Sequence, residues 1–206
     1  MDENKVIPLL PLRGMLVFPG MIINLDVGRD RSIKAVEAAM AIDRKILLVT
    51  QREAGTIEPN ENDLFTYGVI AEIKQLLKLP NGALRILVEG FTRAKIEAVR
   101  DNKDIYFEAE VQEVASIIDD SNEVEALKRM LIETFEQWIL ASKKITSEVL
   151  LTFKDQPDPG RIADMIAGYL TIGIDEKESV LEAINVKDRM NLLYSFLCKE
   201  LEIANI

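Results

Sequence analysis

The residues of this sequence best suited to catalysis form a serine–lysine cluster. Ser142 is followed by Lys143 and Lys144, which supply a hydroxyl nucleophile and a possible amine base. The cluster stands at the end of a segment with helical periodicity, where polar side chains usually meet solvent. We therefore interpret it as a helix end and predict no catalytic residue there.

An acidic pair and a lone cysteine are the other candidates for chemistry. Asp119 and Asp120 could hold a hard cation, but they precede a helical segment, whose positive end favours acidic side chains. Cys198 follows the apolar Leu197 and has only Lys199 beside it as a basic group that could activate a thiol. We interpret the pair as helix-end charge and the cysteine as an ordinary helix residue.

Several residue types and motifs that support catalysis are missing from the sequence. It contains no histidine, which removes the commonest general base and the commonest zinc ligand. It contains neither a G-x-x-x-x-G-K-[ST] phosphate loop nor a G-x-S-x-G elbow. We therefore expect no metal site, no cofactor site and no catalytic residue.

The composition is that of a folded protein with an acidic balance. Apolar residues make up 48% of the 206 residues, which is enough for a packed core, and the net charge is -10. No basic run exceeds two residues, which argues against a nucleic-acid partner. No apolar run approaches the ~20 residues of a membrane span. The single cysteine suits a reducing compartment, so we expect a cytoplasmic protein without a membrane partner.

The first part of the chain, up to about residue 116, shows the period-two alternation of β-strands. Many short strands with one helix are typical of a strongly bent sheet or a partial barrel. Besides a hairpin described next, we expect strands at 45–50, 92–99 and 105–114, and a helix at 31–43 with Asp30 as its N-cap.

The clearest strand signal is a hairpin over residues 69–90. Asn81-Gly82 predicts a two-residue type I′ turn, which needs positive φ at both positions. With that turn, Leu76 would lie opposite Leu87 on an otherwise charged face. This apolar pair is not needed for the core of the hairpin, so it is a candidate for contact with another molecule.

The apolar stretch 7–21 is broken by Pro8, Pro11 and Pro19, which predicts one or two edge strands and a tight turn. Its leftover apolar residues, and those of the hairpin, belong either to the core or to an adaptable patch that holds extended apolar peptides. The candidates for binding substrate proteins are Pro19, Met21, Ile22, Leu76, Leu77, Leu79, Pro80 and Leu87.

The second part, residues 117–206, changes to the helical period. Asp158 before Pro159 predicts a helix start, and Asp175 with Glu178 predicts another. A last helix runs from about Val186 to the end of the chain without Gly or Pro, so it either frays there or continues in a longer protein. Its apolar stripe is a candidate for oligomer contacts through Met190, Leu193, Leu197 and Leu201.

Several segments carry a resemblance to a known family. They are IPLLPLRGMLVFPGM, VGRDRSIKAVEAAM and NDLFTYGVIAEIKQLLKLPNGALRILVEGFTRAKI, then DPGRIADMIAGYL and EKESVLEAINVKDRM. With them the chain resembles the N-terminal domain of bacterial Lon, the ATP-dependent serine protease. The resemblance implies an α+β fold, with a PUA-like β subdomain over 1–116 and a helical bundle over 117–206.

The resemblance also implies a role. The family uses this region to recognise unfolded, damaged or regulatory proteins and to support a homohexamer. Its ATP and Mg sites and its catalytic serine and lysine belong to later domains, and no position here matches their motifs. We therefore expect a binding module that is not itself an enzyme. The alternative is a structural spacer that sets oligomer geometry while substrates are bound elsewhere.

Overall fold

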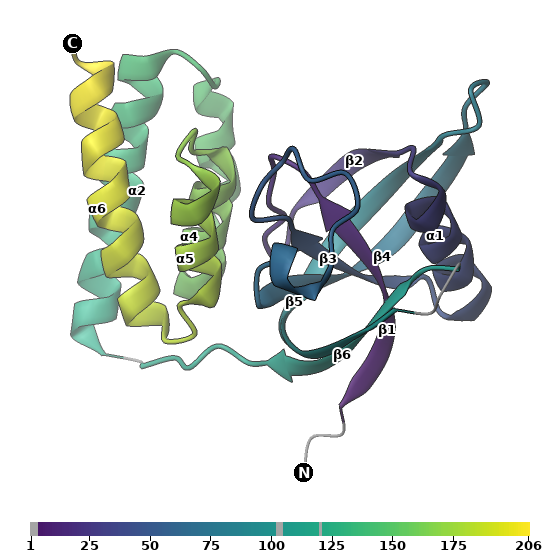
Figure 1. Cartoon of the computed structure of the whole chain (residues 1–206). Coiled ribbons are helices and arrows are strands. Elements are labelled where there is room, and N and C mark those ends of the chain that lie inside the picture. Colours follow the sequence, from purple (N-terminus) through teal and green to yellow (C-terminus); the bar gives the residue numbers. More distant parts are fainter. Residues whose placement is uncertain (1–3, 102–104, 120) are drawn as a thin grey trace. The chain divides into compact units, whose positions relative to one another are not determined.

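The computed structural model describes residues 4–101, 105–119 and 121–206, and the chain divides into two compact units. The first, Met1–Ala115, is built mainly of strands, and the second, Ser116–Ile206, is helical (Figure 1). The predicted class, a bent sheet with one helix followed by a helical bundle, is confirmed. That the two units have separate roles stays a proposal.

The first unit is a sheet that closes on itself. Its elements are β1 (Lys5–Leu12), β2 (Ile22–Val27), α1 (Asp30–Ile42), β3 (Lys45–Thr50), the 3-10 turn η1 (Glu61–Asp63), β4 (Tyr67–Lys78), β5 (Leu84–Asp101) and β6 (Phe107–Val114). The strand order is β2-β5-β4-β3-β1-β6, and β6 also pairs with β5. Because β6 joins both β1 and β5, five of the strands form a closed ring, and β2 lies outside it.

The long strand β5 makes this closure possible by changing its partner midway. It pairs with β2 before Gly90 and with β6 from Arg93 onward. Between them, the Gly90 N–H donates to the carbonyl of Met21 at 2.9 Å, and the Gly90 carbonyl accepts from the N–H of Gly20 at 2.7 Å. A Cβ on Gly90 would lie 2.6 Å from the backbone oxygen of Phe18, so only glycine fits.

The strand β3 is buried on both faces. Ile46 and Leu48 face a core that includes α1 and the β4–β5 hairpin, while Leu47 and Val49 face a second core on the other side. All four are at most 2% exposed. A strand with two buried faces needs a continuous apolar run, which explains why residues 45–50 do not alternate.

The β4–β5 turn is not the predicted type I′ turn. The N–H of Gly82 donates to the Leu79 carbonyl at 3.0 Å, and the N–H of Leu79 donates to the Ala83 carbonyl at 2.9 Å. Gly82 has a φ of 87°, but Asn81 lacks the positive φ that a type I′ turn needs. The loop is a three-residue type I turn that ends in a left-handed glycine, and Pro80 fits its second position because its ring fixes φ near −65°.

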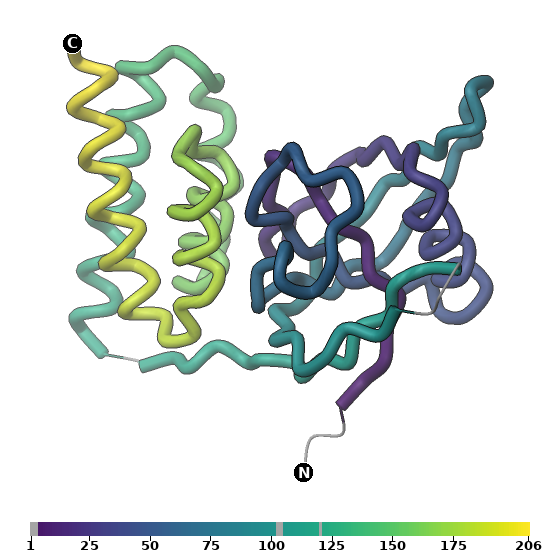
Figure 2. Tube along the Cα trace, viewed as in Figure 1, coloured from purple at the N-terminus to yellow at the C-terminus, as the bar shows by residue number. Residues whose placement is uncertain are grey.

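The longer loop shifts the register of the hairpin by one residue. Leu76 lies opposite Ile86 and Leu77 lies opposite Arg85, so the predicted pairing of Leu76 with Leu87 is wrong. Since a slip of one residue moves side chains to the other face, Leu76 packs against the core and Leu77 becomes exposed. Figure 2 shows this hairpin extending beyond the rest of the first unit.

Two further expectations for the first unit need correction. β1 is not a simple edge strand, because it pairs with β6 through Lys5–Pro8 and with β3 through Leu9–Leu12. Each half leaves one side unpaired, which accommodates prolines without a ladder N–H. The N-cap of α1 is Arg29, and Asp30 lies in the first turn with an ion pair to Lys34 at 3.2 Å.

The second unit contains α2 (Asn122–Ser142), the 3-10 turn η2 (Ser147–Leu150), α3 (Leu151–Lys154), α4 (Pro159–Tyr169), α5 (Ile174–Glu182) and α6 (Val186–Ala204). The predicted start at Asp158 is confirmed, since its carboxylate accepts from the N–H of Gly160 at 2.9 Å. The predicted capping pair of Asp175 and Glu178 is wrong. The N-cap of α5 is Gly173, and Glu178 is buried.

A buried arginine ties the start of the second unit to its last helix. Arg189 is 1% exposed and donates from Nε to the Ala183 carbonyl at 2.9 Å and from Nη2 to Ser116 Oγ at 2.8 Å. The Asp164 carboxylate lies 3.7 Å from its Nη1. A buried cation with such partners fixes the position of the segment that leads into α2.

The closure around Gly90 gives a stability prediction. Gly90→Ala should lower the free energy of unfolding of the first unit by about 1–3 kcal/mol, because the new methyl group overlaps a backbone oxygen that cannot move cheaply. Urea unfolding followed by circular dichroism measures the loss. Gly55→Ala is the matched control, since a Cβ there meets nothing within 4 Å, and it should stay within about 0.5 kcal/mol. Equal midpoints for the two variants would show that Gly90 is not under steric constraint.

Candidate functional site

The predicted substrate-binding residues lie on the β4–β5 hairpin, on the turn before β2 and on the neighbouring stretch of β5, but only some are well exposed. Ile22 is 63% exposed and Leu77 is 58% exposed. Pro80 at the hairpin tip is exposed as well. The other five are half-buried, and two of them, Met21 and Leu76, pack against the core: Pro19, Met21, Leu76, Leu79 and Leu87.

Three of these residues meet in one depression, which we call the hairpin hollow. Leu76, Leu77 and Leu87 line a volume of about 680 Å³ at the base of the hairpin. Met40 adds a fourth apolar residue to this lining. The polar and basic residues of the same hollow are Asn24, Arg44, Lys74, Gln75 and Arg85.

The lysine of the hairpin hollow is held by acidic neighbours. Lys74 Nζ lies 3.2 Å from the Glu89 carboxylate and 3.3 Å from that of Glu72. The hydrogen bonds with Glu89 and then Glu72 raise the pKa of Lys74 above its usual range. The ammonium group also lies 5.5 Å from the ring centroid of Phe91, whose side chain is partly exposed. Two carboxylates thus flank one ammonium group, so the positive charge of Lys74 is more than compensated at this rim.

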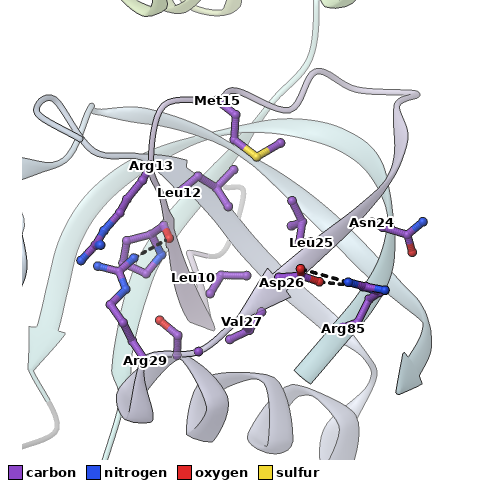
Figure 3. Close-up of a pocket in the computed structure, with 13 residues that line it drawn as sticks. Leu10, Leu12, Arg13, Met15, Asn24, Leu25, Asp26, Val27, Arg29 and Arg85 are labelled. Atoms are coloured by element: carbon purple, nitrogen blue, oxygen red, sulfur yellow. Dashed lines mark hydrogen bonds and ion pairs between the residues drawn. The ribbon is translucent and has the colours of Figure 1, made fainter. Parts of the chain in front are cut away.

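A second depression, which we call the seam hollow, lies where β2 and β1 face each other without pairing. Its volume is about 650 Å³. Figure 3 shows the apolar side chains of Leu10, Leu12, Leu25 and Val27 between two polar ends. The side chains come from β1 and β2, which are not neighbours in the strand order of the described residues. All four belong to the core and are at most 6% exposed, so they form the floor of the hollow.

One polar end of the seam hollow is an ion pair. Arg85 donates from Nε and Nη2 to the two carboxylate oxygens of Asp26, at 2.7 and 3.2 Å (Figure 3). These hydrogen bonds, followed by the attraction between the charges, lower the pKa of Asp26 below its usual range. Arg85 also lines the hairpin hollow, so this pair stands between the two depressions.

The other polar end holds two arginines side by side. Arg29 donates to the Pro11 carbonyl at 2.9 Å and to Gln51 Oε1 at 2.7 Å. Arg13 donates to the carbonyls of Thr56 and Ile57, both at 3.3 Å. Burial, and then the nearby charge of Arg13, lower the pKa of Arg29. All the acceptors are neutral, so these hydrogen bonds do not cancel the two positive charges.

Sequence reasoning missed the arginines of the seam hollow. Arg13, Arg29 and Arg85 are far apart along the chain, and none belongs to a basic run. They line one hollow only because β1 faces the paired strands β2 and β5 in the folded unit. No local signal in the sequence could have found this cluster.

The serine–lysine cluster does not form a dyad. Lys143 adopts a left-handed conformation as the C-cap of α2, and Ser142 Oγ accepts a weak hydrogen bond from the backbone N–H of Lys144 at 3.4 Å. The Lys144 ammonium donates instead to Thr171 Oγ1 at 3.0 Å. The arrangement is that of a helix end, as the sequence predicted.

The remaining candidates for chemistry give no site either. The interpretation of Asp119-Asp120 involves Asp120, which lies outside the described residues. Within the described part of the chain, no group of three or more acidic or thiol side chains could hold a metal ion. Cys198 is partly buried on α6, and its hydrogen bond with Tyr194 raises the pKa of that phenol.

The oligomer contacts predicted on α6 also need correction. Met190, Leu193 and Leu197 are 0% exposed, because α6 packs against α2, α4 and α5. A side chain sealed in the core of its own unit cannot meet another subunit, so these three residues serve the bundle. Leu201 is only half-buried. The apolar side chains that do reach solvent near the ends of α2 and α6 are Leu140 and Ile203, 64% and 62% exposed.

Comparison with known proteins relates the chain to the substrate-binding domain of one protease family. Residues 6–199 match the family model described as the ATP-dependent protease La (LON) substrate-binding domain. The chain is 50% identical over its whole length to the Lon protease of Desulforamulus reducens, and 44% identical to that of Escherichia coli. These alignments cover 25% and 26% of the two relatives, so the chain spans about a quarter of their length.

Solved structures share the fold. The N-terminal domain of the Mycobacterium avium complex Lon protease superposes with a TM-score of 0.78 at 24% identity, over 94% of this chain and 98% of that one. The Lon N-terminal domain protein from Xanthomonas campestris gives 0.67 at 18% identity, over 93% and 98%. At these identities the likeness concerns the fold alone.

The Asp26–Arg85 pair gives a pH prediction. The folded pKa of Asp26 lies below its unfolded value, so the pair stabilises the fold above the unfolded pKa, and this contribution is lost as the pH falls through the folded pKa. Titration of the Asp26 carboxyl carbon by NMR should therefore give a midpoint below 3.8, the ordinary value. Arg85→Gln should move the midpoint upward, whereas Arg100→Gln, which removes an arginine from another ion pair, should not. An unchanged midpoint in Arg85→Gln would contradict the assignment.

Proposed function

Because the chain belongs to the family of Lon substrate-binding domains, we propose that it binds segments of substrate proteins that expose apolar side chains. The observation that carries the proposal is the exposure of two apolar side chains of the first unit. Leu77 lines the hairpin hollow, and Ile22 lies on β2 two residues before the lining residue Asn24. Unfolded or damaged proteins expose such side chains, and folded ones mostly do not. A regulatory protein with an exposed apolar segment would be recognised in the same way.

The contact is suited to weak binding of many sequences. A few hundred Å² of apolar contact at about 25 cal/mol/Å² gives several kcal/mol, of which the ordering of a flexible client offsets most. Leucine and methionine side chains adapt to different partners. A single copy should therefore bind a client with low affinity, and several linked copies should bind it with much higher overall affinity.

The rest of the activity belongs to longer proteins. Relatives of about four times this length carry the name protease. We propose that peptide cleavage, and the ATP hydrolysis with Mg that the family resemblance implies, belong to the parts of those relatives that this chain does not match. Among the helices of the described residues, none is long and apolar enough to cross a membrane. With the single cysteine, a cytoplasmic location fits the proposal.

A second candidate function is support of assembly into a homo-oligomer, which the family resemblance implies to be a hexamer in full-length members. It is favoured by Leu140 and Ile203, which are exposed on α2 and α6. These two helices pack side by side and run in the same direction (Figure 1). Both residues lie near the C-terminal ends of their helices, so they reach the same end of the bundle.

Paired aspartate variants test client binding. Ile22→Asp with Leu77→Asp should weaken binding of a reduced, carboxymethylated α-lactalbumin roughly tenfold, because both charged groups would stand on the proposed contact surface. Fluorescence anisotropy of the labelled client measures the affinity. Leu140→Asp with Ile203→Asp is the matched control, since those side chains are equally exposed in the other unit. Undiminished binding by the first variant, with circular dichroism unchanged, would refute the assignment of the surface.

The same two variants test assembly with a different readout. Sedimentation velocity at increasing protein concentration should show weaker self-association for Leu140→Asp/Ile203→Asp than for the parent chain, since burying a carboxylate in an interface is costly. Ile22→Asp/Leu77→Asp should sediment like the parent. Identical behaviour of all three proteins would count against a role of this end of the bundle in assembly.

A further inference from the structure

We propose that the seam hollow binds an extended segment of a client that joins the free edge of β2 as an additional strand and places a carboxylate beside Arg13 and Arg29. The inference rests on the proposed function and specifies how one part of the client is recognised. Three observations support it: an unpaired strand edge, an apolar lining next to that edge, and an excess of positive charge at one end.

The outer edge of β2 has free backbone groups. In the described part of the chain β5 is the only strand that pairs with β2, and β2 ends the strand order. Gly90 donates to the Met21 carbonyl, and in an antiparallel ladder such hydrogen-bonded pairs alternate with non-bonded ones. It follows that Ile23 and Leu25 bond to β5, while the N–H and C=O groups of Ile22, Asn24 and Asp26 point outward. An edge of this kind accepts an extended peptide by strand addition.

The seam hollow provides a place for the side chains of such a strand. Successive residues of an added strand point to opposite faces, so every second side chain would face the lining of Leu10, Leu12, Leu25 and Val27. The volume of about 650 Å³ is large enough for more than one leucine-sized group. Apolar client residues at alternate positions are therefore expected.

Charge complementarity selects the kind of segment. The lining of the seam hollow contains three arginines and one aspartate, which gives 3 − 1 = +2, although the whole chain carries -10. The aspartate is already paired with Arg85. Within the described part of the chain, the two remaining guanidinium groups, on Arg13 and Arg29, donate to neutral acceptors, and Arg13 lies at the exposed rim. A carboxylate would compensate this charge and accept hydrogen bonds from both groups.

A pair of peptides tests the electrostatic part. Both are fluorescein-labelled and blocked at their ends, with alternating leucine and threonine over eight residues. One is flanked by a glutamate at each end, the other by a glutamine at each end. The glutamate peptide should bind the parent chain roughly three- to tenfold more tightly. Because the chain as a whole is acidic, its net charge would repel the glutamate peptide and so favour the glutamine peptide. A preference for the glutamate peptide can therefore come only from a local positive site.

Arginine variants locate the preference. Arg13→Gln should abolish the difference between the two peptides, while Arg52→Gln should preserve it, since Arg52 is an exposed arginine that stacks on Phe65 outside the seam hollow. Equal binding of the two peptides by the parent chain, or a preference that survives Arg13→Gln, would overturn the proposal.

Backbone variants test the strand addition. Asn24→Pro removes an outward N–H without removing a hydrogen bond to β5, and it should weaken both peptides roughly fivefold or more. Asn24→Val keeps the N–H and should bind like the parent. In addition, methylation of alternate backbone nitrogens of the glutamate peptide should abolish binding for one set of positions and spare the other. Urea unfolding establishes that each variant is folded. Equal effects of the two methylated sets would exclude strand addition.

The outcomes separate this inference from the proposed function. If unfolded α-lactalbumin binds and its binding is lost in Ile22→Asp/Leu77→Asp, the proposed function holds whatever the peptides do. If the peptides bind without charge preference and without sensitivity to Asn24→Pro, only the strand addition at the seam hollow fails. If neither α-lactalbumin nor either peptide binds, both ideas fail.

Discussion

The first unit depends on one constraint, which is that β5 must bond to two different strands along the same edge. Its early residues pair with β2 and its later residues with β6, and the change occurs next to Gly90. There the backbone of Phe18, in the segment that leads into β2, lies so close that a Cβ on Gly90 would clash with it. If β5 kept β2 as its partner throughout, β6 could not reach it and the ring of strands would stay open. Closure therefore excludes β2 from the ring and leaves one of its edges free.

The surfaces proposed for binding are consequences of this closure. The seam hollow exists because β1 and β2 end up facing each other without a hydrogen-bonded partner between them, and the hairpin hollow exists because β4 and the start of β5 extend past the ring. Native sheets usually protect such an edge with short strands and charge. β2 has six residues and carries Asp26, which is consistent with an edge that is kept soluble yet remains available.

The sequence predicted the elements better than their details, because periodicity is local and register is not. Strand β3, the helix start at Asp158 and the long α6 followed from apolar spacing and capping residues alone. The hairpin register failed because Asn81-Gly82 fits two turn types, and Pro80 decided between them. The apolar spacing correctly predicted that one face of α6 is buried. Spacing alone does not show whether such a face packs within its own unit or against another chain.

In the candidate site, too, features that depend on local sequence were predictable and features that depend on contacts between distant segments were not. The apolar half of the surface was visible in the sequence, since Ile22 and Leu77 stand in segments with more apolar residues than a hairpin needs. The positive half was not, since Arg13 and Arg29 lie on either side of β2 in the chain and meet only through the β1–β2 arrangement. Apolar contact alone distinguishes unfolded from folded clients but not one client from another. A charged end and a strand edge add orientation to that contact, because hydrogen-bond directions and charge depend on how the client lies, whereas apolar burial does not.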